Sequence, residues 1–114
     1  MSTQAKNDIE VGVAERLRTV FHTGAGSTDN VELWERTWIC NMASGTSTLY
    51  LPYVALAKGL RFTFLVRTGS NILTIADRDD SEGWTDVTIE DAGDTLTVES
   101  DGTQWILVES YEAD

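Results

Sequence analysis

The sequence predicts an all-β protein, an antiparallel meander folded as a β-sandwich or a small barrel. Three observations predict it: an Asp-Gly hairpin signal near the C-terminus, a short apolar-threonine-apolar triplet that occurs four times, and turn residues between the triplets. Period-two alternation with turns at near-regular spacing is typical of such folds. We also expect a short helical turn near 52–58 and an extended N-terminal arm.

The arm is predicted for residues 1–30, and the β-domain for residues 31–114. The arm begins with a polar stretch, contains an ambiguous amphipathic segment at 9–22 that fits a short helix or a strand, and ends in the loop sequence TGAGSTDN. Alternating residues predict strands at 31–42 and 47–51. Between the second strand and the next, Pro52 suits the first position of a helix and Gly59 the residue after its end, which predicts the helical turn.

The triplets come next in the chain, and each places two apolar residues on one side of a strand and a threonine on the other. They are Phe62-Thr63-Phe64, Leu73-Thr74-Ile75, Val87-Thr88-Ile89 and Leu96-Thr97-Val98. We interpret this repetition as the rhythm of successive strands and not as a solenoid repeat. The apolar members are therefore expected in the core.

The last triplet belongs to the hairpin signal, DTLTVESDGTQWILVE at 94–109. Asp-Gly between alternating hydrophobic residues favours a two-residue type I′ turn, in which both central residues have positive φ. This turn would form the pairs Ser100 with Thr103, Val98 with Trp105, and Leu96 with Leu107. Leu96, Val98, Trp105 and Leu107 would then share one face, and that face would be a wall of the core.

Charge is divided unevenly along the chain. Residues 1–76 carry six acidic and seven basic side chains, a net charge of +1, whereas residues 77–114 carry thirteen acidic side chains and one arginine, a net charge of −12. An acidic surface repels nucleic acid and anionic membranes, so we expect neither as a partner. No apolar run reaches the length that crosses a bilayer, and the N-terminus lacks a signal-peptide pattern, which predicts synthesis in a cytoplasm.

Residues that could carry chemistry are few. A Ser-His-Asp triad would have to use His22, the single histidine, and no G-x-S-x-G motif frames a serine. Cys40, within a predicted strand, indicates a buried small residue. The series Asp77, Asp79, Ser81 and Gly83 resembles a calcium loop but lacks the glycine and glutamate of an EF-hand at the required positions. We expect no enzymatic activity, no cofactor and no metal.

Part of the chain resembles small structural proteins of tailed bacteriophages. The resemblance rests on Leu51-Pro52, on Ala57-Lys58-Gly59 with the strand after it, on the acidic stretch 77–84, and on Ser100-Asp101-Gly102 before Trp105. It covers residues 48–108. The family includes head decoration (cement) proteins and domains of tail fibres, which are often trimers. The resemblance implies a structural role in the virion.

These observations predict a capsid decoration protein on the virion surface, with the major capsid protein and its own copies, as a homotrimer, as partners. The N-terminal part would dock on the capsid and the acidic part would face water. The expected capsid-docking residues are Ile9, Val11, Val13, Leu17, Val20, Phe21, Trp34 and Trp38.

Two other functions were weighed. A tail-fibre module that recognises surface glycans would use Trp84 with Asp79 and Asp80, because aromatic rings and carboxylates together bind sugars. An inhibitor that mimics DNA is suggested only by the number of acidic residues, which crowd the turns and the C-terminus without phosphate-like spacing.

Overall fold

The computed structural model describes residues 18–79 and 87–111. Within these ranges the protein is all-β and contains no helix, as the sequence predicted for its fold class. The strands form two mixed sheets, one of five strands in the order β1-β3-β5-β8-β9 and one of four in the order β2-β4-β6-β7. The strands are β1 (Arg18–Thr23), β2 (Ser27–Asn30), β3 (Glu35–Met42), β4 (Ser47–Tyr50), β5 (Arg61–Gly69), β6 (Leu73–Ala76), β7 (Val87–Ile89), β8 (Thr95–Ser100) and β9 (Trp105–Tyr111).

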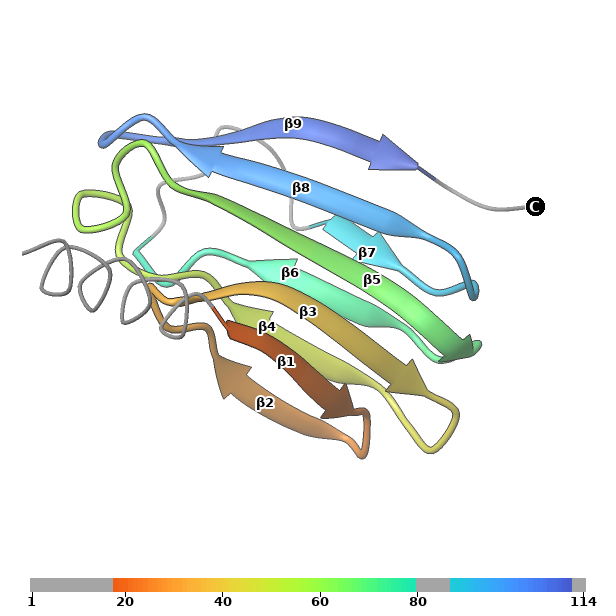
Figure 1. Ribbon diagram of the computed structural model, residues 1–114. Helices are drawn as coiled ribbons and strands as arrows, with labels where there is room; N and C mark the ends of the chain where they lie inside the picture. Colours follow the sequence, from red (N-terminus) through yellow and green to blue (C-terminus); the bar gives the residue numbers. More distant parts are fainter. Residues whose placement is uncertain (1–17, 80–86, 112–114) are drawn as a thin grey trace, which may run out of the picture.

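The first six strands form three stacked coils, each with one strand in either sheet (Figure 1). β1 and β2 make the first coil, β3 and β4 the second, and β5 and β6 the third. Each strand runs parallel to its counterpart in the next coil: β1 pairs with β3 and β3 with β5, while β2 pairs with β4 and β4 with β6. This part of the fold is a short parallel solenoid.

The prediction of an antiparallel meander is therefore wrong for the pairing of β1 to β6 with one another. The triplets are not the repeat of these coils, because they lie on β5, β6, β7 and β8. The reason for the parallel pairing lies in the connections, which carry the chain from one sheet to the other and do not return it within a sheet. Successive connections stack closely: a Cβ on Gly24 would lie 2.3 Å from the carbonyl oxygen of Gly45. Gly69, with φ of +91°, approaches the backbone of Ala43 in the same way. Only glycine permits this approach.

The antiparallel prediction is correct for the remaining strands, where triplet pairs with triplet. Phe62-Thr63-Phe64 on β5 lies opposite Leu96-Thr97-Val98 on β8, and the two threonine hydroxyls are 3.1 Å apart. Leu73-Thr74-Ile75 on β6 lies opposite Val87-Thr88-Ile89 on β7. Of the eight apolar members of the triplets, all except Val87 are buried, and Val87 packs against the core from a partly buried position.

The predicted hairpin forms, but its loop is longer than expected. Ser100 pairs with Trp105, and not with Thr103, so the register is shifted by two residues. The cause is Asp101, whose Oδ1 accepts hydrogen bonds from the backbone N–H groups of Thr103 (2.8 Å) and Gln104 (2.7 Å). This Asx-type loop needs positive φ only at Gly102.

From Val98 to Ser100 the shift is even, which keeps these residues and Trp105 on their predicted faces, and a bulge between Thr97 and Val98 then brings Ser110 opposite Leu96. Leu96, Val98 and Trp105 are fully buried as expected. The fourth predicted wall residue, Leu107, is instead 39% exposed, since β9 extends along the rim of the sheet beyond the opposite sheet.

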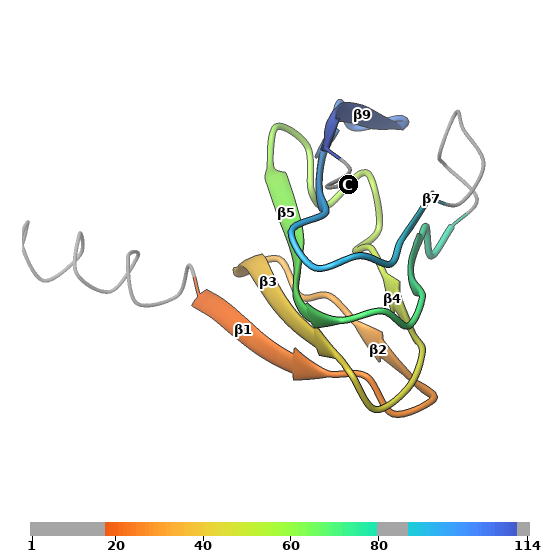
Figure 2. The same ribbon diagram turned by 90° about the vertical axis from the view of Figure 1, so that its right-hand side faces the viewer.

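The core fills the space between the two sheets, which face each other in Figure 2. Its largest members form ring contacts: Phe62 and Trp105 meet edge to face with centroids 5.7 Å apart, and Trp38 lies 6.5 Å from Phe64. Both pairs include a residue from β5, which lies at the centre of the five-stranded sheet. Burial of these aromatic side chains therefore holds the parallel and the antiparallel parts together.

Two further expectations about local structure fall in or near the described ranges. The N-terminal arm was predicted for residues 1–30, but residues 18–30 contain β1 and β2 and belong to the sheets; residues 1–17 lie outside the described residues. At the expected helical turn, residues 54–57 form consecutive turns, in which the N–H of Ala57 donates to the carbonyl oxygen of Tyr53 (3.2 Å).

Candidate functional site

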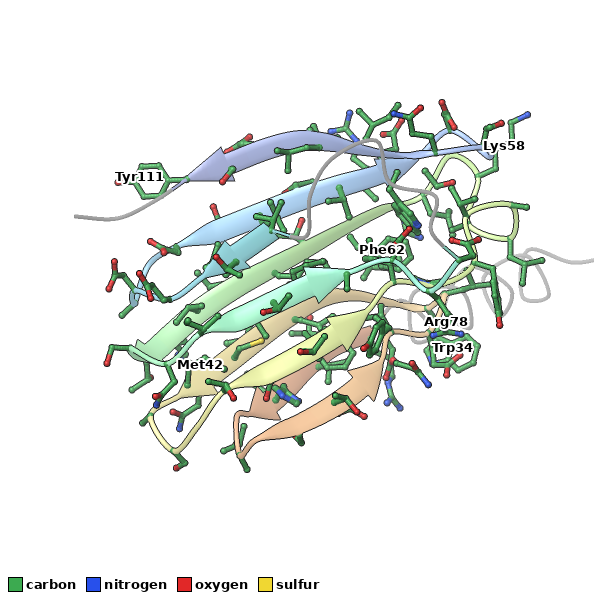
Figure 3. All side chains as sticks on the ribbon, turned by 180° about the vertical axis from the view of Figure 1, so that it is seen from behind. Trp34, Met42, Lys58, Phe62, Arg78 and Tyr111 are labelled. Atoms are coloured by element: carbon green, nitrogen blue, oxygen red, sulfur yellow. The ribbon has the colours of Figure 1, made fainter. Side chains whose placement is uncertain are left out.

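One end of the stack carries exposed aromatic and apolar side chains, and we call it the loop-end surface. It consists of Trp34 before β3, Tyr53 and Leu56 between β4 and β5, and Arg78 after β6. Trp34, Tyr53 and Leu56 are 45%, 48% and 67% exposed. Figure 3 shows Arg78 and Trp34 together at this end, with Met42 at the opposite end. The parallel coils cause the gathering, because β2, β4 and β6 run in the same direction and the chain leaves all three at this end.

Arg78 joins the parts of the loop-end surface. Its guanidinium carbon lies 5.2 Å from the centroid of the Tyr53 ring, a cation–π contact. Its Nη2 donates to the carbonyl oxygen of Val31 at 3.4 Å. The next residue, Asp79, accepts a hydrogen bond from the N–H of Val54 at 3.1 Å. These contacts connect the three loops that follow β2, β4 and β6. The exposed aromatic side chains therefore belong to loops that hold one another in place.

A second cluster lies inside the first two coils and consists of His22, Asp29 and Ser47. The Nε2 of His22 is 2.9 Å from the Oγ of Ser47, and its Nδ1 is 3.4 Å from the Oδ2 of Asp29. The ring of His22 also packs against Trp38, with centroids 5.7 Å apart. The imidazole and the Ser47 hydroxyl share a hydrogen bond at Nε2, and the Asp29 carboxylate lies within ion-pair distance of Nδ1.

This connectivity is the one found in serine hydrolases, yet its surroundings indicate a structural role. Ser47 is 3% exposed and His22 is 8% exposed, so a substrate carbonyl cannot approach the hydroxyl in this conformation. The cluster supplies a hydrogen-bond partner to the buried imidazole of the first coil, where an unpaired ring nitrogen would be costly. Sequence reasoning missed it because the parallel stacking alone brings these three residues together.

The residues predicted to dock on a capsid fall in different environments. Phe21, on β1, is 71% exposed, and Trp34 belongs to the loop-end surface. Val20 is partly buried and packs against the core. Trp38 is only 2% exposed, and its Nε1 donates to the carbonyl oxygen of Glu35, so it supports the core beneath the surface. Ile9, Val11, Val13 and Leu17 lie outside the described residues.

Of the three residues named in the glycan hypothesis, only Asp79 belongs to the described residues. Trp84 and Asp80 lie outside the described residues. Asp79 is exposed, but one of its carboxylate oxygens accepts a hydrogen bond from the N–H of Val54. Sequence reasoning did not single out Tyr53, Leu56 or Arg78 for any site. The signal for them was weak, because an aromatic, a leucine and an arginine far apart in the chain form a surface only when the coils stack.

Cys40 is buried on β3, as expected from its strand sequence, and burial raises the pKa of its thiol to about 12. It therefore stays protonated at neutral pH, and the protonated thiol is not a nucleophile. In the described ranges, no three His, Cys, Asp or Glu side chains are grouped so that they would hold a metal ion. Residues 18–79 and 87–111 also contain no apolar helix of membrane-spanning length.

Comparison with known proteins returns no relative: no family model, no curated protein and no solved structure matches the chain.

Proposed function

We propose that this chain is a structural protein of a bacteriophage virion, a decoration protein that binds the assembled head and stabilises it. The single observation that carries the proposal is the loop-end surface, where Trp34, Tyr53 and Leu56 are exposed together on loops that hold one another in place. Exposed aromatic residues next to an arginine are the composition that binding hot spots favour. The resemblance of residues 48–108 to phage structural proteins agrees with this function.

The mechanism follows from linkage. A protein that binds only the assembled shell lowers the free energy of that shell by an amount that grows with its concentration over its Kd. Rigid docking residues favour such binding, because few side chains must be ordered when the contact forms. The acidic C-terminal part, with its net charge of −12, would remain in water. Copies of the chain are expected to act together as a homotrimer.

The experiment is sedimentation of the purified protein with heads assembled from the major capsid protein of the phage that encodes it. We expect saturable binding of the wild type. Trp34→Ser removes the largest exposed ring and should weaken binding about thirtyfold, which corresponds to a hot-spot loss of about 2 kcal/mol. Ile72→Ser is the matched control, because Ile72 is 43% exposed but lies at the opposite end of the stack. It should bind like the wild type.

Absence of binding to heads would contradict the proposal. The alternative, a tail-fibre module that recognises surface glycan, predicts a different result: saturable quenching of tryptophan fluorescence by sugars, lost in Trp84→Ala and retained in Trp34→Ser.

A further inference from the structure

Within the described residues, four strands form the edges of the two sheets: β1 and β9 in one sheet, β2 and β7 in the other. Edge strands expose unpaired backbone groups, and proteins commonly blunt them with polar residues or short length. β2 has the sequence STDN and β7 has only three residues, so both are blunted. β9 has seven residues and carries a bulge at Val108, so that its regular apolar edge is the part before the bulge, Trp105 to Leu107.

β9 exposes more apolar side chains than is usual for an edge strand. Ile106, Leu107 and Val108 are 41%, 39% and 39% exposed, and Tyr111 is 58% exposed. Neighbouring residues of a strand point to opposite faces, so both faces of β9 present apolar side chains. A row of exposed apolar residues on an open edge is the arrangement that pairs with another strand.

The other edge of the same sheet has complementary properties. On β1, Phe21 is 71% exposed, and Arg18 is the only charged residue, with a side chain that remains 57% exposed beside Glu35. On β9 the only charged residue is Glu109, which is exposed. The β1 edge, with one exposed aromatic ring and one base, can therefore face the β9 edge, with its exposed apolar residues and one acid.

The directions of the strands also allow this pairing. β1, β3 and β5 run parallel, β8 runs antiparallel to β5, and β9 antiparallel to β8. β9 therefore runs in the same direction as β1, at the far side of the sheet (Figures 1 and 2). A rotation about an axis parallel to the strands preserves their direction, so it can bring β1 of one copy beside β9 of another in parallel.

Pairing of β9 with β9 of a second copy is less favourable. It would place two Glu109 side chains and two segments with a net charge of −12 next to each other. Pairing with β1 instead brings the acidic part of one copy to the near-neutral part of the next, residues 1–76 with a net charge of +1. Like charges held close together oppose association, so the charge pattern favours the unequal contact.

We propose that copies of this chain associate through the β9 edge of one copy and the β1 edge of the next. A contact between two different surfaces closes into a ring when its rotation permits. The number of copies, three, rests on the function proposed above, whereas the identity of the two edges rests on the structure alone.

The experiment measures mass in solution by light scattering after gel filtration. We expect a trimer for the wild type and monomers for Phe21→Asp and Ile106→Asp, each of which spoils one edge. An equimolar mixture of the two variants retains one intact pair of edges, so it should form a complex of twice the monomer mass. Ile72→Asp, which adds the same charge at a similarly exposed position elsewhere, should remain a trimer.

A monomeric wild type would overturn the inference. It would also be overturned if Phe21→Asp kept the wild-type mass and the mixture gave no new complex, because a β9–β9 contact predicts that result. Circular dichroism and thermal melting check that the variants fold; Tyr111→Asp and Thr19→Asp, at exposed positions of the same edges, replace any variant that does not. A monomeric wild type that still binds heads would refute this contact alone, and a trimer without head binding would refute the proposed function alone.

Discussion

The parallel coils of residues 18–76 and the antiparallel strands of residues 87–111 both match like side chains across their strands, but they differ in their turns. In the antiparallel part, an apolar-threonine-apolar triplet lies opposite another triplet, so side-chain pairs across the strands agree with the register. In the parallel part the strands are matched as well, since Thr37 on β3 lies opposite Thr63 on β5, and Trp38 lies opposite Phe64. Close contacts between successive turns are added to this match in the coils.

The turns of the coils contact one another through residues from different positions in the chain. Gly24 approaches Gly45, and the side-chain amide of Asn71 donates to the carbonyl oxygen of Met42 at 2.7 Å. The backbone of Gly69 lies against the next turn at Ala43. The stacked turns of the parallel coils depend on glycine at particular positions, whereas the antiparallel strands depend mainly on buried apolar area. The two parts should therefore respond differently to substitution.

The largest effect is expected where the antiparallel part joins the core. Trp105→Ala removes a fully buried ring that meets Phe62 edge to face, and we expect a loss of about 3–5 kcal/mol in the free energy of unfolding. Urea denaturation measures this loss. Ile72→Ala, at a position that is 43% exposed and lies on neither edge strand, should change stability by about 0.5 kcal/mol or less. Equal effects of the two substitutions would mean that Trp105 is not packed in the core.

The next effect concerns a turn of the parallel part. Gly69→Ala places a methyl group 2.3 Å from the backbone of Ala43 at a positive φ, and should cost about 3 kcal/mol. Gly59 is the matched control, since its φ is also positive, +81°, but a Cβ there meets nothing within 4 Å. Gly59→Ala should cost only the backbone strain, about 1–2 kcal/mol. If both variants unfold at the same urea concentration, close stacking of the turns is refuted.

A smaller effect is expected at Ser100, which links the hairpin to the segment between β4 and β5. Its hydroxyl is fully buried, donates to the carbonyl oxygen of Val54 at 2.6 Å and accepts from the N–H of Gly102. Ser100→Ala leaves both groups without this partner and should cost about 1–3 kcal/mol. Thr103→Ala, in the exposed loop, serves as the control. Thermal melting that does not separate the two variants would contradict this role.

The smallest effect is a pH dependence at Asp101. Hydrogen bonds from the N–H groups of Thr103 and then Gln104 lower the pKa of its carboxyl group below the ordinary value. Because the pKa is lower in the folded state, the carboxylate stabilises the fold above its unfolded pKa, and this contribution is lost as pH falls through the folded pKa. Asp101→Asn keeps an acceptor oxygen but removes this titration, so its stability should fall less than that of the wild type on acidification.

Local patterns in the sequence predicted one part of the fold well. Alternation of apolar and polar residues is a local pattern, because it depends only on neighbouring positions in the chain. It correctly predicted the burial of Cys40, of Trp105 and of the apolar triplet residues other than Val87. The hairpin loop was misjudged because the side chain of Asp101 competes with a type I′ turn for the backbone N–H groups.

The parallel coils and the candidate sites could not be predicted in this way. The contacts of Gly24 with Gly45, and of His22 with Ser47, join residues more than twenty positions apart, and no local pattern records them. Trp34 is 45% exposed, whereas Trp38, four residues later, is in the core. Sequence alternation assigns such residues to a face, but only the stacking decides which face is covered.

The stacking of parallel coils is the claim on which the sites depend, and nuclear Overhauser contacts between backbone protons of paired strands test it most directly. For β3 and β5 the account predicts contacts of Thr37 with Thr63, Trp38 with Phe64 and Ile39 with Leu65, with the numbers of both partners rising together. For β4 and β6 it predicts the same order, Thr48 with Thr74 and Leu49 with Ile75. Contacts in which one number rises while the other falls would show antiparallel pairing and contradict the account.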